Sequence, residues 1–275
     1  MVGHTELGRC VKDDSGPSLF MQESRKNTNE GIGAIIIISE TIYLLEKERE
    51  KKKKSDLETA METMKPLEVC VKAAVCDPNA LGNCPCSQTV LMMLEEKYVP
   101  YNKKLIDVNH MPQWFREISP EGKVPALKID NKWIFDSDVI TDMLDDRYPI
   151  PPLASPPEFS SLGSKIMPLL ARFLKSTDQS DGSEKALVDE LQVLDEHLKV
   201  HGPYVDGDDV TSIDLFLAPK LYHMETVLSH FKNWTIPKSL KYVENYCEML
   251  FSRLTFIKTH ASPDCVISGW EAKLQ

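Results

Sequence analysis

Five prolines crowd the segment 149–157, and they constrain the fold more than any other feature of the chain. Proline fixes its φ angle and has no backbone N–H, so this segment can form neither a helix interior nor a central strand. The hydrophobic patterns on its two sides also differ. We therefore expect a proline-rich linker at 149–157, between a domain at 66–148 and a second domain at 158–275.

The residues before this linker alternate between strand and helix patterns. Leu67, Val69 and Val71 share one face of a strand, and a helix is predicted over 85–97. A second strand at 101–108 and a short helix after Pro112 follow. Strands at 124–129 and 132–135 flank a turn at Asp130, and a helix runs from 136 to about 148. The expected order is β-α-β-α-β-β-α.

The residues after the linker carry helical patterns throughout. One apolar stripe is formed by Phe159, Leu162, Ile166, Leu169, Leu170 and Phe173, and a second by Leu187, Leu191, Leu194 and Leu198. The string Thr211-Ser212-Ile213-Asp214 is typical of a capping box at the start of a central helix. We expect an all-helical domain here.

Residues 1–65 differ in composition from the rest of the chain and are interpreted as an extension. We predict that this extension is poorly ordered apart from a helical stretch over about 39–64. A helix that binds a partner or a membrane surface is the alternative. The apolar run 32–38 is far shorter than the ~20 residues that span a bilayer. The acidic residues of this extension do not fit a transit peptide. We expect no membrane span, no plastid targeting and a cytoplasmic protein.

Charge and cysteine content narrow the possible partners. A net charge of -10 argues against nucleic-acid binding, which requires a basic surface. The seven cysteines show no disulfide framework, which favours a reducing compartment. No cysteine–histidine set has the spacing of zinc ligands, so we expect no metal.

Cys84 is the main candidate for chemistry, because it lies where an extended loop ends and a helix begins. Pro85 suits the first helical position, which makes Cys84 the cap residue. A helix start stabilises an anion and can lower a cysteine pKa from about 8.5 to roughly 3.5–7.5. A buried structural thiol is the alternative. Cys86 could resolve an oxidised Cys84, but Ser87 occupies the usual position of such a partner, so Cys86 is interpreted as structural or incidental.

Several strings resemble plant glutathione-dependent dehydroascorbate reductases, which belong to the glutathione transferase superfamily. They are EVCVKAA at 68–74, SPEGKVP at 119–125, DSDVI at 136–140, GSEKAL at 182–187, LAPKLYH at 217–223 and the Gly269-Trp270 pair. The resemblance covers about 65–275. It implies a thioredoxin-like domain followed by a helical domain, and reduction of dehydroascorbate by two molecules of glutathione. We also expect a monomer.

The resemblance also implies a glutathione site. Val124-Pro125 resembles the cis-proline turn, whose free backbone groups pair with the cysteinyl part of glutathione. Asp136 and Ser137 resemble the pair that holds its γ-glutamyl end. Lys72 would add positive charge near the Cys84 thiolate and the tripeptide.

Lys72, His223 and Trp270 are the candidate residues of the dehydroascorbate pocket, by the same resemblance. A satisfied core histidine is the alternative for His223, and a terminal anchor on the core is the alternative for Trp270.

Three positions depart from the family pattern. Asn83 and Cys86 stand where these enzymes usually have aspartate and phenylalanine, and Met111 stands where a lysine is expected to contact the glycyl carboxylate. We expect weaker glutathione binding. The alternatives are an omega-like thioltransferase, a membrane-associating protein like the chloride intracellular channels, and a glutathione-binding module without activity.

Overall fold

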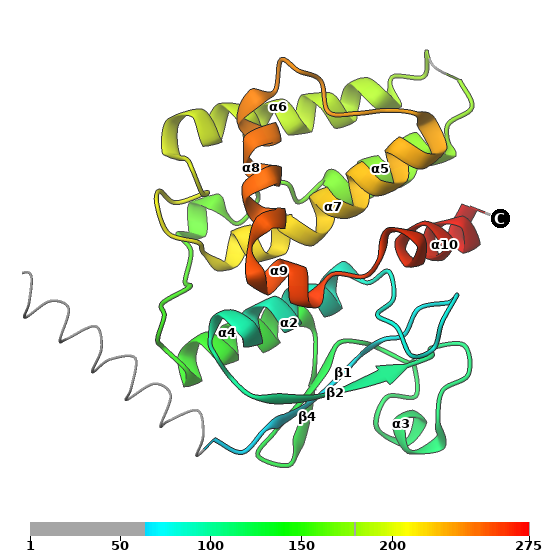
Figure 1. Cartoon of the computed structure of the whole chain (residues 1–275), viewed down its shortest axis with the longest axis vertical. Coiled ribbons are helices and arrows are strands. Elements are labelled where there is room, and N and C mark those ends of the chain that lie inside the picture. The colour runs from blue at the N-terminus through cyan, green and yellow to red at the C-terminus, as the bar shows by residue number, and fades with distance from the viewer. Residues whose placement is uncertain (1–63, 179, 275) are drawn as a thin grey trace, which may run out of the picture. The chain divides into compact units, whose positions relative to one another are not determined.

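The computed structural model describes residues 64–178 and 180–274, which belong to one compact unit (Figure 1). Nearly all of the predicted extension, including the apolar run 32–38, lies outside the described residues. The division at 65, 148 and 157 therefore stays a prediction.

The first half of the described chain forms the predicted β-α-β-α-β-β-α order. Its elements are β1 (Leu67–Lys72), α2 (Pro85–Glu96), β2 (Tyr101–Ile106), α3 (Gln113–Ile118), β3 (Ala126–Ile129), β4 (Lys132–Phe135) and α4 (Ser137–Arg147). The sheet order is β2-β1-β3-β4, with β1 parallel to β2 and the other pairs antiparallel. Asp130 and Asn131 have φ angles of 49° and 64°, as a tight β3–β4 hairpin requires. The thioredoxin-like fold is confirmed.

The two faces of this sheet bury different residues, because successive side chains of a strand point in opposite directions. Val69 and Val71 join the main core, whereas Cys70 packs with Phe115 of α3 in a smaller cluster. In Figure 1, α2 and α4 lie between the sheet and the helices of the second half, and α3 lies on the other side.

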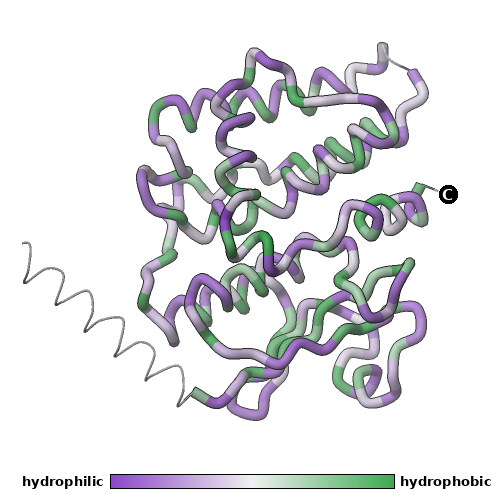
Figure 2. The backbone as a smooth tube through the Cα atoms, in the orientation of Figure 1, coloured by the Kyte–Doolittle hydropathy of each residue, from purple (hydrophilic) through white to green (hydrophobic). Residues whose placement is uncertain are grey.

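The second half of the chain is helical, as predicted. It contains η1 (Pro157–Phe159), α5 (Ile166–Lys175), α6 (Ser183–His201), α7 (Ser212–Lys232), α8 (Lys241–Ser252), α9 (Leu254–Thr259) and α10 (Pro263–Leu274). The capping box at Thr211 and Asp214 is present at the start of α7. In Figure 2 these helices alternate between hydrophilic and hydrophobic stretches, as amphipathic helices do.

The stripe from Phe159 to Phe173 is not one continuous helix, which corrects the sequence prediction. Phe159 ends the short η1 turn, and α5 begins only at Ile166. Gly163 interrupts the pattern with a φ angle of 61°, and a Cβ there would come within 2.3 Å of Leu217 Cδ2. This close approach explains why a glycine separates the two helical pieces.

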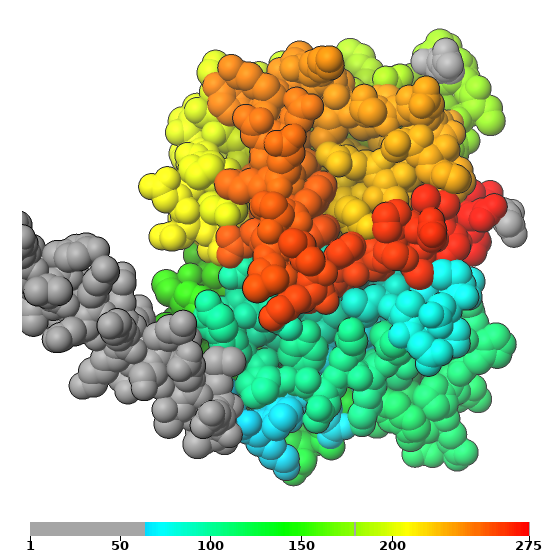
Figure 3. Space-filling view, in the orientation of Figure 1, coloured from blue at the N-terminus to red at the C-terminus, as the bar shows by residue number. Residues whose placement is uncertain are grey.

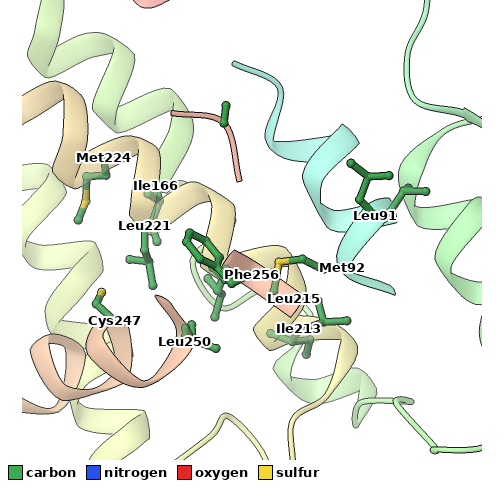
Figure 4. Packing of buried hydrophobic residues seen from close by; sticks show 14 of the residues in the cluster. Leu91, Met92, Ile166, Ile213, Leu215, Leu221, Met224, Cys247, Leu250 and Phe256 are labelled. Carbon is green, nitrogen blue, oxygen red and sulfur yellow. The ribbon is translucent and has the colours of Figure 1, made fainter. Parts of the chain in front are cut away.

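Helix α2 is fixed between the two halves of the molecule. Leu91 and Met92 of α2 pack in one core with Leu215 of α7 and Phe256 of α9 (Figure 4). At the far end of α2, the Glu96 carboxylate forms an ion pair with Arg253 at 2.8 Å. These contacts give the first turn of α2, where Cys84 lies, a fixed position.

Candidate active site

Cys84 is the N-cap residue of α2, and Pro85 takes the first helical position, as predicted. Its φ and ψ angles of -119° and 101° are extended, so its side chain turns back over the first turn. The Cys84 Sγ accepts a hydrogen bond from the Ser87 backbone N–H at 3.4 Å. Cys84 as a residue is half-buried, and its sulfur lies against the helix start that stabilises it.

The surroundings of Cys84 favour the thiolate. A hydrogen bond from the Cys86 thiol is the main cause that lowers the pKa of Cys84, to about 6. Burial opposes this change, while the hydroxyl and backbone N–H of Ser87 and the charge of Lys72 add to it. The pKa of the Cys86 thiol is raised, mainly because that thiol donates to Cys84. At neutral pH, Cys84 is the ionised member of the pair.

Lys72, at the end of β1, lies behind the thiol. Its Nζ donates a hydrogen bond to Asn83 Oδ1 at 2.8 Å. Burial lowers the pKa of Lys72, and the charge of Lys273 lowers it further, whereas the Cys84 thiolate raises it. Lys72 therefore supplies positive charge near Cys84, and Lys273 lies close enough to Lys72 to lower the pKa of Lys72.

The peptide bond between Val124 and Pro125 is cis, as the resemblance implied. Ala126 of β3 pairs with Cys70 of β1 in antiparallel register. Because the strands run in opposite directions, the residues before Ala126 lie beside the residues after Cys70. The cis-proline turn therefore lies at the same end of the sheet as Lys72, where β1 ends and β3 begins.

Asp136 and Ser137 begin α4. The Asp136 Oδ1 caps this helix by accepting hydrogen bonds from the backbone N–H groups of Asp138 at 2.9 Å and Val139 at 3.3 Å. Asp136 has a φ angle of 92°, which is rare for a residue with a side chain and occurs at functional sites. The Ser137 hydroxyl lies within hydrogen-bonding reach of the Cys86 thiol, so the first turns of α4 and α2 meet.

His223 and Trp270 form a buried pair, with exposed fractions of 1% and 5%. The Trp270 Nε1 donates to His223 Nδ1 at 3.3 Å. Burial lowers the pKa of His223 to about 3, and the charges of Lys273 and Lys72 contribute, so His223 is neutral. Its low pKa argues against a role as a general acid, and the burial of the pair also fits the alternatives of a core histidine and a terminal anchor.

Helix α10 also contacts the loop that carries Cys84. A Cβ on Gly269 would come within 2.2 Å of Asn83 Cγ, so the helix backbone lies directly on the Asn83 side chain. Asn83 is 2% exposed and its Nδ2 has no hydrogen-bond partner among the described residues. The last described helix therefore packs on Asn83, the residue before Cys84.

Comparisons with known proteins agree with this geometry. Residues 83–147 match the family model of the glutathione S-transferase N-terminal domain. The chain is 56% identical to glutathione S-transferase DHAR2 of Arabidopsis thaliana over 209 residues, which cover 76% of this chain and 98% of the relative. The chain belongs to the plant dehydroascorbate reductase (DHAR) family of glutathione S-transferases. No helix among residues 64–178 and 180–274 is long and apolar enough to cross a membrane.

Other DHAR relatives differ in the location that their names give. The probable glutathione S-transferase DHAR1, cytosolic, of Oryza sativa is 57% identical, with coverage of 76% and 98%. Glutathione S-transferase DHAR3, chloroplastic, of Arabidopsis thaliana is 52% identical, with coverage of 76% and 81%. The crystal structure of Chlamydomonas reinhardtii dehydroascorbate reductase matches with a TM-score of 0.67 at 32% identity, and the match covers 75% of this chain and 98% of that one.

Chloride intracellular channel protein 3 of Mus musculus is a more distant relative. It is 28% identical, and the match covers 69% of this chain and 89% of the relative. The channel-like alternative is therefore not favoured over the DHAR family.

The departures from the DHAR pattern have structural consequences. Met111 is half-buried and packs on the loop before Val124, since a Cβ on Gly122 would lie 2.7 Å from Met111 Sδ. Its apolar side chain carries no charge to this loop. Cys86 replaces an aromatic ring with a small thiol beside Cys84.

Sequence reasoning missed two contacts made by helix α10. Lys273 lies over the Trp270 ring at 4.8 Å, and Gly269 contacts Asn83. The Gly269-Trp270 string was the available signal, but only the folded chain shows that α10 reaches Asn83. Among the described residues, no group of three histidine, cysteine or acidic side chains could hold a metal ion.

Proposed function

We propose that this protein catalyses the glutathione-dependent reduction of dehydroascorbate to ascorbate, with Cys84 as the reacting group. The single observation that carries the proposal is the Cys84 sulfur at the start of α2, with its pKa lowered to about 6. A thiolate is the nucleophilic form of cysteine, and most of Cys84 is in this form at neutral pH. Membership in the DHAR family supports the choice of substrate.

We assign glutathione to the space between the starts of α2 and α4. The backbone of Val124, freed by the cis bond to Pro125, would pair with the cysteinyl part of glutathione as an added strand does. The hydroxyl and backbone N–H of Ser137 would meet the γ-glutamyl carboxylate. The Asp136 carboxylate, which also accepts from the N–H groups of Asp138 and Val139, would meet the ammonium group of the same γ-glutamyl end. This arrangement would direct the thiol of glutathione to Cys84.

The reaction has three steps. In the first step, Cys84, dehydroascorbate and water give ascorbate and a sulfenic acid on Cys84, so dehydroascorbate gains two electrons that the sulfur loses. Glutathione then condenses with the sulfenic acid, releasing water and forming a mixed disulfide. A second glutathione attacks that disulfide, releases glutathione disulfide and restores the Cys84 thiolate.

The neighbours of Cys84 have positioning roles in this scheme. Lys72 would hold the developing negative charge of ascorbate, since its ammonium group lies near the Cys84 thiol, and Lys273 would add positive charge through its proximity to Lys72. We assign His223 and Trp270 to the rear wall of the dehydroascorbate pocket. We further propose a cytoplasmic monomer without nucleic-acid partners or metal, which size-exclusion chromatography and a fluorescent fusion would test.

A coupled assay of glutathione-dependent ascorbate formation by the full chain tests the proposal. We expect turnover by the wild type, a loss on the order of 10³-fold or more in Cys84→Ser, and most of the turnover in the matched variant Cys86→Ser. Near-normal turnover by Cys84→Ser would show that another group is the nucleophile.

The same proteins should be assayed with a glutathionylated peptide and with lipid vesicles. Faster release of glutathione from the peptide than formation of ascorbate would support the thioltransferase alternative, which uses the same cysteine. Oxidation-dependent binding to vesicles would support the channel-like alternative.

A further inference from the structure

A second pair of thiols joins the loop between β1 and α2 to helix α10. The Sγ atoms of Cys76 and Cys265 lie 2.9 Å apart, although the two residues are 189 positions apart in the sequence. Cys76 is exposed, whereas Cys265 is 6% exposed. One sulfur of this pair is therefore open to a reagent in solution, and the other is shielded directly behind it.

The backbone on both sides holds the two sulfurs in place. The Cys76 loop is closed by a bridge between Ala73 and Leu81 and by a hydrogen bond from Ala74 N–H to the Ala80 carbonyl at 2.9 Å. Cys265 lies in the first turn of α10, next to the buried Val266. The two sulfurs face each other in a folded framework, so no rearrangement of an element is needed to join them.

We propose that Cys76 and Cys265 form a redox pair that glutathione disulfide oxidises to an intramolecular disulfide, which fastens α10 to the loop leading to Cys84. The pair is separate from the reacting thiol. The choice of glutathione disulfide as the oxidant rests on the proposed function, since this molecule is the product of the reaction.

The oxidation follows ordinary thiol–disulfide exchange. The Cys76 thiolate attacks one sulfur of glutathione disulfide, forms a mixed disulfide and releases one glutathione thiolate. Cys265 then loses its proton, attacks the Cys76 sulfur and releases the second glutathione. Two protein thiols are oxidised and one glutathione disulfide is reduced to two glutathione molecules.

The environment of the pair favours this order of attack. A hydrogen bond from the Cys265 thiol, followed by one from the Ser268 hydroxyl, lowers the pKa of Cys76. Burial raises the pKa of Cys265, and its hydrogen bond to Cys76 adds to this effect. The exposed sulfur is thus the better initial nucleophile, and the buried one is positioned to complete the bond.

The disulfide would act on the helix that covers the active site. Figure 3 shows α10 lying directly against the segment that follows β1. The same helix places Gly269 on Asn83 and Trp270 on His223. Joining its first turn to the Cys76 loop would keep these contacts formed when the protein is heated, and it would also restrict the unfolded chain by closing a long ring.

The test uses the full chain with Cys84→Ser, so that the reacting thiol is absent. This protein is equilibrated with mixtures of reduced and oxidised glutathione, its free thiols are alkylated, and its peptides are mapped by mass spectrometry. We expect a peptide linked through Cys76 and Cys265 and a melting temperature roughly 5–10 °C above that of the reduced protein. Adding Cys76→Ser should abolish both effects, whereas the matched addition of Cys86→Ser should leave both.

Two results would overturn the proposal. One is a glutathionyl group that remains on Cys76 while Cys265 is alkylated as a free thiol. The other is a linked pair that produces no rise in melting temperature. Because Cys76 lies on an exposed loop, Cys76→Ser keeps the test decisive even if changes at the buried Cys265 prevent folding. The readouts do not involve ascorbate, so failure here is distinguishable from failure of the proposed enzyme activity.

Discussion

The starts of helices α2 and α4 lie close together but use their free N–H groups differently. In α4, the Asp136 carboxylate accepts two backbone hydrogen bonds, at 2.9 and 3.3 Å. In α2, the Cys84 sulfur accepts one backbone hydrogen bond, at 3.4 Å. The Asp136 cap gives two backbone N–H groups of α4 a strong acceptor. The Cys84 cap gives one backbone N–H group of α2 a weak acceptor.

This difference separates a binding role from a reactive role. A well-bonded carboxylate fixes the start of α4 and leaves Ser137 to face a ligand. A weakly bonded sulfur keeps its electron pair available while still gaining from the positive end of α2. Two residues in the same N-cap position therefore have different roles: Asp136 stabilises a helix, and Cys84 is the reactive group.

Replacing the reactive cap with a structural one should give the largest effect. In Cys84→Asp, a carboxylate would bond to the N–H groups of α2 as Asp136 does in α4. We expect turnover to fall on the order of 10³-fold or more while stability rises by about 0.5–2 kcal/mol. The ascorbate assay and urea denaturation measure the two changes. A loss of stability would show that the two helix starts are not equivalent.

Removing the structural cap should give the next largest effect. Asp136→Ala loses both hydrogen bonds and keeps the unfavourable φ angle of 92°, so we expect a loss of about 1–2 kcal/mol in stability and about tenfold in glutathione affinity. Calorimetric titration with glutathione measures the affinity. Asp136→Asn, the control, keeps the cap and should lose affinity with little loss of stability; equal losses of stability in both variants would contradict the cap assignment.

The pH dependence of Cys84 should show a smaller effect. Because its pKa is about 6, the rate of alkylation by iodoacetamide should rise with pH through 6 and level off above about 7. Cys86→Ala removes the main hydrogen-bond donor to the sulfur, which raises the pKa and moves this midpoint to higher pH. Cys86→Ser retains a donor and should stay near the wild type. An unchanged midpoint in Cys86→Ala would assign the low pKa to the helix start and Lys72 instead.

Restoring a positive charge at position 111, near the proposed glutathione site, should give the smallest effect. Met111→Lys would place an ammonium group near the loop before Val124, where the family pattern has a lysine. We expect the KM for glutathione to fall by a few-fold, with kcat unchanged, because one exposed ion pair adds up to about 1 kcal/mol. Steady-state kinetics at varied glutathione measures this, and Met111→Gln controls for the loss of apolar packing. An unchanged KM in Met111→Lys would remove Met111 as the cause of weak binding.

Local patterns in the sequence were enough to predict most of the fold. Alternation at Leu67, Val69 and Val71 predicted β1, and the Cys84-Pro85 pair predicted the start of α2. The prediction was wrong at Gly163, where the positive φ angle ends a helical stripe that periodicity alone continues. The helical domain predicted over 158–275 includes α9 and α10, but the sequence analysis gave neither helix its own bounds; α9 spans only six residues and offers little periodicity.

The site was predictable only where a residue's position in its own element determines its chemistry. Cys84 and Asp136 are caps, and a cap is visible in the local sequence. The contact of Gly269 with Asn83 and the proximity of Cys76 to Cys265 depend on how α10 docks. Neither contact leaves a local pattern, because the partners are far apart along the chain.

The packing of α10 on Asn83 determines when the site is completed during synthesis on the ribosome. Gly269 and Trp270 are translated long after Cys84, and domains fold from the N-terminal side during synthesis. The sheet and α2 can therefore form while the surface of Asn83 still faces water. A nascent chain stalled before Pro263 should have a folded thiol-bearing half with an incomplete pocket, and Cys84 in that chain should be alkylated faster than in the finished protein.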